Sequence, residues 1–271
     1  MPGRKRTWEA ISFELVMTAS ALVALVLIVA PSLVIMIVSF TSGFSLKFPP
    51  PGYSLRWYVE LANAWQLHFA ARNSLVVAFW STALSILLGV AAALAIARSR
   101  TLSARLLDSL FMSPLVLPAL AFGLAALMLF SLVGLPVSPL TLVIGHTVVC
   151  VPYVVRNTVA ALAQLEPTLL ESSAVLGASQ VYTFRRIVLP LIRPGVIAGA
   201  FIAFMSSFDN VPVSLFLRDA ATDMLPIRMW QDLEGKLDVT IAALSSVLII
   251  ATVALVTVME RVSGLSRRLT S

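Results

Sequence analysis

The sequence predicts an all-α, polytopic membrane protein with six transmembrane helices, because of its composition and the length of its uncharged segments. Of its 271 residues, 59% are hydrophobic and 12% are charged, whereas a soluble domain carries about 25% charged residues. The mean hydropathy is +0.96. The uncharged segments are too long for the strands of a membrane barrel. An ordinary soluble enzyme and a disordered chain are therefore excluded.

Five segments with at most one charged residue account for the six predicted spans. The first has 26 residues and would reach about 39 Å as a helix, enough to cross a membrane with tilt. The longest has 47 residues, and Gly134-Leu135-Pro136 divides it into the third and fourth spans. In order, the segments are residues 15–40, 73–97, 109–155, 194–217 (which contains Asp209) and 239–259.

Two connections are predicted on the outer side. Residues 41–72 are rich in proline and aromatic residues, including Trp57 and Tyr58. Such side chains suit a membrane interface, so we expect a loop with a short surface helix there. Residues 218–238 form a mixed-charge outer loop.

The basic residues predict the orientation of the spans. With six spans both termini lie on one side, and 13 of the 19 Lys and Arg residues fall on that side. Both termini are therefore expected in the cytoplasm, with 1–14 as the N-terminal segment, 15–262 as the transmembrane domain and 263–271 as the tail. The apolar run that follows the basic start is too long for a signal peptide, so the first span is expected to be uncleaved. The 13 residues are Arg4, Lys5, Arg6, Arg98, Arg100, Arg105, Arg156, Arg185, Arg186, Arg193, Arg261, Arg267 and Arg268.

The single cysteine limits the metal chemistry that is open to the chain. Cys150 alone cannot form an intrachain disulfide or a cysteine-built metal site. His146 and Cys150 lie one helical turn apart, which offers a metal pair as an alternative. A metal site needs more ligands than this region holds. We therefore expect no metal and no cofactor, with His146 packed in the core.

One connection on the cytoplasmic side, between Arg156 and Pro194, is longer than a simple turn requires. Pro167 is typical of the first turn of a helix and Gly177 of its end, where a bulky side chain would clash or strain the backbone. Ser179 can cap a second helix, which Pro190 is expected to stop or kink. The first helix is expected to carry an apolar stripe of Leu169, Leu170, Ala174 and Leu176, with Glu171, Ser172 and Ser173 outside it.

This segment resembles the EAA loop of permeases from binding-protein-dependent ABC importers. Glu171-Ser172-Ser173 is followed by Gly177, six residues after the glutamate, and then by Ile187-Val188-Leu189-Pro190. The family pattern has Glu-Ala-Ala at the start, so both alanines are serine here. The resemblance places the coupling loop at residues 160–192.

The resemblance extends to the spermidine/putrescine-type subfamily. The sequence at 112–118 resembles the start of that subfamily's third span, and the sequence at 146–153 resembles the end of its fourth. Phe208-Asp209-Asn210 resembles an acidic position in the fifth span, where the subfamily often has two aspartates. The loss of the second carboxylate puts a polycationic solute in question, because the subfamily also imports other small solutes.

The resemblance implies a type I ABC importer permease in the bacterial inner membrane, moving a polyamine-like or related organic solute. Separate ATPase subunits would hydrolyse ATP, since the chain has no phosphate-binding loop and is not itself an enzyme. The implied partners are these ATPases, a related second permease, an extracytoplasmic solute-binding protein and the lipid bilayer, with no nucleic acid. The residues implied in coupling are Glu171, Ala174, Gly177, Ile187, Leu189 and Pro190.

Asp209 is the only carboxylate within the predicted spans. Ser206, Asp209 and Asn210 share one helix face by their spacing, and we expect that face to line the translocation pathway. The alternative is a solvated carboxylate at the outer interface. Arg185 and Arg186 have two interpretations as well, contact with the ATPase or attraction to anionic lipid.

Two other functional classes compete with the importer. A secondary transporter should contain internal repeats and charged or broken helices near the middle of the membrane. The sequence has no clear repeat and only Asp209 at that depth. A membrane enzyme should gather several reactive side chains at one depth, and two histidines with one cysteine are too few.

Overall fold

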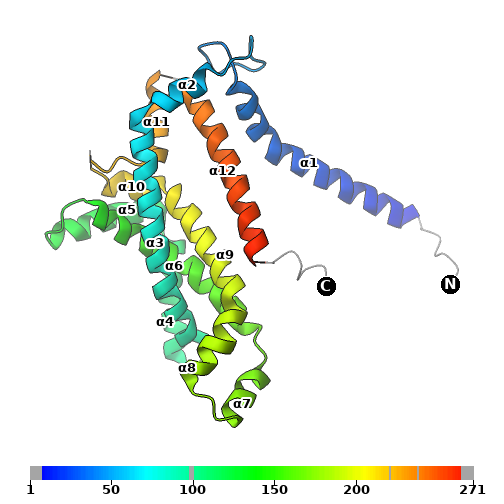
Figure 1. The fold of residues 1–271 in the computed structure, drawn as a ribbon, viewed down its shortest axis with the longest axis vertical. Coiled ribbons are helices and arrows are strands. Elements are labelled where there is room, and N and C mark those ends of the chain that lie inside the picture. The colour runs from blue at the N-terminus through cyan, green and yellow to red at the C-terminus, as the bar shows by residue number, and fades with distance from the viewer. Residues whose placement is uncertain (1–7, 98–100, 220, 237, 264–271) are drawn as a thin grey trace. The chain divides into compact units, whose positions relative to one another are not determined.

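The computed structural model describes residues 8–97, 101–219, 221–236 and 238–263. Within these residues the regular elements are helices, and a single isolated antiparallel β-bridge joins Thr41 and Tyr53. The elements are α1 (Trp8–Val38), α2 (Arg56–Asn63), α3 (Trp65–Ala97), α4 (Leu102–Val116), α5 (Ala119–Leu132), α6 (Pro139–Ala163), α7 (Pro167–Val175), α8 (Gln180–Thr183), the π-helical turn η1 (Phe184–Val188), α9 (Leu189–Phe208), α10 (Val211–Leu217), α11 (Leu225–Lys236) and α12 (Thr240–Ser263) (Figure 1).

The described chain divides into two compact units. The first contains the residues up to Ala64 together with Asp232–Val253. Its helices are joined by Tyr58 on α2, whose hydroxyl lies 2.7 Å from the Ser39 hydroxyl and 3.2 Å from that of Ser246 on α12. The Arg56 guanidinium lies 4.3 Å from the centre of the Phe44 ring. The short helix predicted within residues 41–72 is thus present as α2.

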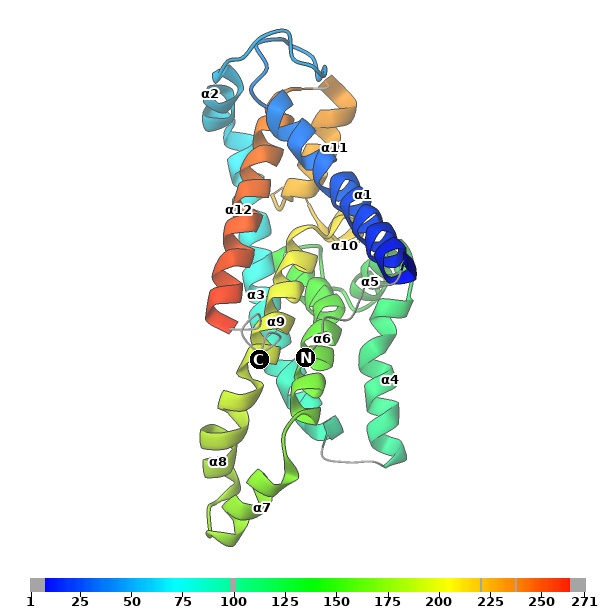
Figure 2. The same ribbon diagram turned by 90° about the vertical axis from the view of Figure 1, so that its right-hand side faces the viewer.

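The second unit contains Trp65–Gln231 and the described residues from Ala254 onward. Its centre consists of α3, α6 and α9, which pack along one another (Figure 2). Glycine permits this close approach. A Cβ at Gly89 would lie 2.8 Å from Cβ of Val154, and one at Gly199 would lie 2.9 Å from Cα of the same valine. Small residues let membrane helices pack with their backbones close together.

Five helices are long and apolar enough to cross a membrane, and the bent pair α4–α5 raises the number to six if it counts as one span. The break predicted at Gly134 is confirmed, since α5 ends at Leu132 and α6 begins at Pro139. Ser138 caps α6 by accepting a hydrogen bond from the Thr141 amide. The predicted outer loop at 218–238 contains α11.

The third span is broken at Pro118, one of the two prolines in this part of the chain. The chain bends by 106° between α4 and α5, at Leu117 and Pro118. A residue before proline disfavours helical backbone, and Leu117 has extended geometry with ψ of 140°. The proline therefore turns the chain sharply, and α4 and α5 form a broken span or a re-entrant pair.

The fifth span differs from its prediction. Helix α9 ends at Phe208, nine residues before the predicted end at Leu217. Asn210 instead caps α10, its side-chain oxygen accepting a hydrogen bond from the Val213 amide at 3.0 Å. Pro212 occupies the first turn of α10, where its missing N–H costs no hydrogen bond. The apolar segment 194–217 that predicted the fifth span therefore extends beyond the end of α9.

Candidate functional site

Helix α7 ends in a tight glycine turn, as the sequence predicted. Gly177 has a φ of +74°. Its amide donates to the Ala174 carbonyl at 2.9 Å, and the Ala178 amide donates to the Ser173 carbonyl at 3.1 Å. This pair of bonds is the Schellman motif. A Cβ at position 177 would meet no described atom within 4 Å, so the predicted clash is wrong and only backbone strain opposes a side chain there.

The helix after this turn is continuous with the fifth span. Ser179 caps α8 as predicted, accepting a hydrogen bond from the Tyr182 amide at 3.3 Å. Of the two outcomes predicted at Pro190, a stop or a kink, the stop is wrong, because the helix runs unbroken over Gln180–Phe208. The proline ring would collide with the carbonyl of Arg186 in a regular helix. The π turn η1 spans that carbonyl, and the Leu189 amide donates instead to the carbonyl of Phe184, five residues back.

The burial of the side chains on α7 does not follow the predicted apolar stripe. Ser173 was expected outside, but it is 5% exposed and its hydroxyl lies 2.7 Å from that of Thr183. Leu176 of the predicted stripe is 85% exposed, and Val175 beside it is 87% exposed. The sequence pattern failed here because the partner of Ser173 lies on α8. We call Val175 and Leu176 the apolar tip.

The six residues implied in coupling fall into two groups. Glu171, Ala174 and Gly177 are exposed on α7 and its turn. Ile187, Leu189 and Pro190 belong to the continuous helix, where Ile187 is half-buried and the other two are exposed. Between α7 and the ends of the spans lies an apolar groove of about 580 Å³. It is lined in part by Leu94, Leu162, Leu165, Leu170, Ala174 and Thr183.

The three residues predicted to share one pathway face do not lie on one helix. Ser206 is half-buried within α9, whereas Asp209 follows the end of that helix and is exposed. Asn210 is buried and caps α10. The predicted i, i+3 and i, i+4 spacing fails because the helix ends at Phe208. Asp209 therefore lies in the break between α9 and α10 and belongs to neither helix.

His146 on α6 links the two sides of this break. Its Nδ1 atom lies 2.8 Å from the Ser207 hydroxyl on α9, and its Nε2 atom lies 3.1 Å from the Ser214 hydroxyl on α10. All three side chains are fully buried. Cys150 is buried as well, and its thiol donates to the Ala203 carbonyl. Both ring nitrogens are therefore occupied by serine hydroxyls, as expected for a packed core histidine.

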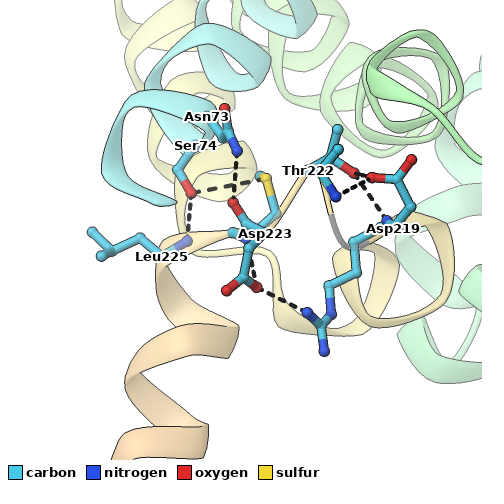
Figure 3. Close-up of polar contacts among 9 residues, drawn as sticks. Asn73, Ser74, Asp219, Thr222, Asp223 and Leu225 are labelled. Atoms are coloured by element: carbon cyan, nitrogen blue, oxygen red, sulfur yellow. Dashed lines mark hydrogen bonds and ion pairs between the residues drawn. The ribbon is translucent and has the colours of Figure 1, made fainter. Parts of the chain in front are cut away.

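A polar cluster around residues 218–225, shown in Figure 3, was not predicted from the sequence. Arg218 forms an ion pair of 2.8 Å with Asp223, whose carbonyl accepts a hydrogen bond from the Asn73 side chain at 3.1 Å. The hydrogen bond from the Thr222 hydroxyl lowers the pKa of Asp219. Only the polar pair Asn73-Ser74 at the edge of an apolar run could have signalled this contact.

Comparisons with known proteins identify relatives among the membrane components of transport systems. Residues 85–270 match the family model described as "Binding-protein-dependent transport system inner membrane component". The spermidine/putrescine transport system permease protein PotC of Haemophilus influenzae is 29% identical over 78% of this chain and 82% of its own length. The molybdenum transport system permease protein ModB of Mycobacterium bovis is 33% identical over 65% of this chain and 72% of its own length.

The fold also resembles that of a solved bacterial ABC transporter involved in the import of the acidic polysaccharide alginate. The TM-score is 0.73 at 14% identity, over 96% of this chain and 99% of the matched chain. At this identity the likeness concerns the fold alone. It confirms the predicted all-α, polytopic fold class.

The His146 network predicts a large difference between the two histidines of the chain. We expect His146→Ala to lower the midpoint of thermal unfolding in detergent by about 5 °C or more, because it leaves a cavity and two buried hydroxyls without their partner. His68, which is exposed on α3, provides the matched control, and His68→Ala should leave the midpoint unchanged. Equal midpoints for the two variants would show that the network contributes nothing to stability.

Proposed function

The chain belongs to the family of binding-protein-dependent transport system inner membrane components, and we propose from this premise that its α7–α8 segment docks on an ATPase subunit. It is the permease subunit of an ABC importer, a multi-pass protein of the inner membrane and not an enzyme. Family membership also removes the secondary transporter and the membrane enzyme as alternatives. Docking at residues 160–192 follows the resemblance to the EAA loop.

The apolar tip is the observation that carries the docking proposal. Val175 and Leu176 are 87% and 85% exposed at the end of a helix that a Schellman turn terminates. Full burial of such a side chain against a partner is worth about 1.5–3 kcal/mol. The exposed Glu171 and Ala174 lie on the same short helix and border the contact. The tip is therefore the part of the segment with most to gain from a partner surface.

The continuous helix supplies the route from the docking site to the spans. Thr183 is the last residue of α8, and the same helix continues through η1 into α9. A push on the tip reaches this helix through the turn at Gly177 and the Ser173–Thr183 contact, and the helix passes it to the packed centre of α3, α6 and α9. In this account ATP hydrolysis by the partner changes the packing of the spans and alternates access to the two sides.

The proposed orientation puts the α7–α8 segment and both termini in the cytoplasm. Arg105, Arg156, Arg185, Arg186 and Arg193 are exposed near this end of the described chain, in agreement with the positive-inside rule. Arg261 is exposed in the last turn of α12. The other predicted basic residues, 4–6, 98, 100, 267 and 268, lie outside the described residues. An extracytoplasmic binding protein would deliver the solute at the opposite face, and a related second permease would complete the pathway.

The proposed solute is a small organic cation of the polyamine type. The name of PotC, which is similar to this chain over most of its length, supports that class. Asp209 supports it as well, because this exposed carboxylate stands where α9 ends. Asn210 occupies the position of the subfamily's second aspartate and is committed to capping α10. One carboxylate would therefore meet the cation here.

Reporter fusions test the orientation. Fusions after Arg105 and after Arg193 should report a cytoplasmic position, because they follow basic connections. Fusions near Pro50 and near Asp223 should report an external position. The measurement is the ratio of alkaline phosphatase to fluorescent-protein activity at each site. The reverse order would contradict the proposed topology.

Substitution at the tip tests the docking. Val175→Asn should weaken binding of the ATPase about tenfold or more, since it removes an apolar contact worth about 1.5–3 kcal/mol. Leu132 provides a matched control, because it is 84% exposed and also precedes a Schellman turn, at Gly134. Leu132→Asn should leave binding unchanged. The measurement is the ATPase concentration that half-saturates permease in nanodiscs, and equal values for the two variants would exclude the tip as the docking site.

Neutralising Asp209 tests the solute class. Asp209→Asn should lower the uptake of a cationic solute by proteoliposomes about tenfold, because a charge-assisted contact is lost. Insertion and ATPase binding should not change. Uptake of a neutral or anionic solute, if the transporter accepts one, should stay as in the unmodified chain. Full uptake of a confirmed cationic solute by the variant would leave Asp209 as a solvated interfacial residue.

A further inference from the structure

We propose that the hydrogen bond between Ser173 and Thr183 fixes the angle between α7 and the continuous helix Gln180–Phe208, and so positions the apolar tip for its ATPase. The inference rests on the proposed docking of the α7–α8 segment and names two residues that control it. Neither residue is expected to touch the ATPase. Both would act as positioning residues.

The geometry singles out Ser173 within its helix. Its hydroxyl lies 2.7 Å from that of Thr183, and its side chain is 5% exposed. The residues on either side of it, Ser172 and Ala174, are exposed. Of the two serines in the Glu-Ser-Ser sequence, the second therefore faces α8 and the first faces outward.

The connections of α7 explain why the bond between Ser173 and Thr183 can control its angle. Helix α7 is joined to α6 through residues 164–166 and to the continuous helix through the turn at Gly177, so it can rotate about these two connections. The bond to Thr183 adds a side-chain attachment between α7 and α8 beyond the turn. The groove of about 580 Å³ borders Leu170 and Ala174 of α7, so this side of the helix is not held by a filled core. The hydrogen bond to Thr183 therefore restrains the rotation of α7 about its two connections.

The hydroxyl group at position 173 distinguishes this chain from the family pattern. The EAA pattern has alanine where this chain has Ser173, and a methyl group cannot donate or accept this bond. The departure from the pattern thus adds a restraint and does not merely tolerate a small polar side chain. We infer that the tip of this permease is held in a narrower range of angles than alanine at position 173 would allow.

Binding measurements on the assembled permease pair in nanodiscs test the proposal. Ser173→Ala and Thr183→Val should each raise the half-saturating ATPase concentration about two- to tenfold, the effect of one hydrogen bond of typical net strength. The double variant should be no weaker than either single variant, because the bond is already lost. Thr183→Ser retains a hydroxyl and should bind as the unmodified chain does. Ser172→Ala is the exposed control and should have no effect.

A second measurement follows the angle directly. Spin labels on Glu171→Cys and Arg193→Cys report the distance between α7 and α9, and the buried Cys150 is shielded from labelling. The distance distribution should broaden with Ser173→Ala and not with Ser172→Ala, while the thermal unfolding midpoint stays the same.

The possible failures are distinguishable. If the unmodified permease does not bind the ATPase, the proposed docking fails. If it binds, and Ser173→Ala matches Ser172→Ala in both binding and distance distribution, the docking stands and the positioning role of Ser173 is excluded. Additive effects in the double variant would equally overturn the proposal, since they would mean that the two hydroxyls act separately.

Discussion

The uninterrupted helix from Gln180 to Phe208 is the constraint on which the proposed mechanism depends. It has 29 residues and spans about 44 Å if its rise is that of an α-helix. Pro190 would ordinarily end or kink such a helix. The π turn at Phe184–Val188 keeps the Leu189 amide hydrogen-bonded, to the carbonyl of Phe184, and the helix continues. One rigid element thus joins the turn after α7 to the centre of the second unit.

The far end of this element is tied to two other helices through one histidine. Ser207, in the last turn of α9, is held by His146 of α6, which also holds Ser214 of α10. Along its length the helix packs on α6 at a distance that only glycine allows at position 199. A packed interior does not deform gradually. A displacement of the helix is therefore passed to α6 and α10 and is not absorbed where it begins.

Much of this arrangement was predictable from local signals. Uncharged runs located the spans, and Pro167, Gly177 and Ser179 located the ends of the helices in the α7–α8 segment. The failures have a common cause, since they depend on backbone breaks or distant partners. Hydropathy cannot register the end of α9 at Phe208, because the residues after it are uncharged apart from Asp209. The burial of Ser173 was not predicted because its partner, Thr183, lies on another helix. The contacts of His146 could not be predicted either, because its serine partners lie 61 and 68 residues away.

The central claim is that the apolar tip enters a site on the ATPase. Site-specific cross-linking tests it most directly. A photoreactive amino acid at Leu176 should capture the ATPase in membranes that contain the assembled transporter, and the same group at Leu132 should not. The account predicts a cross-linked product of permease and ATPase that depends on position 176. Equal capture from both positions, or none from position 176 in a transporter that still imports its solute, would contradict it.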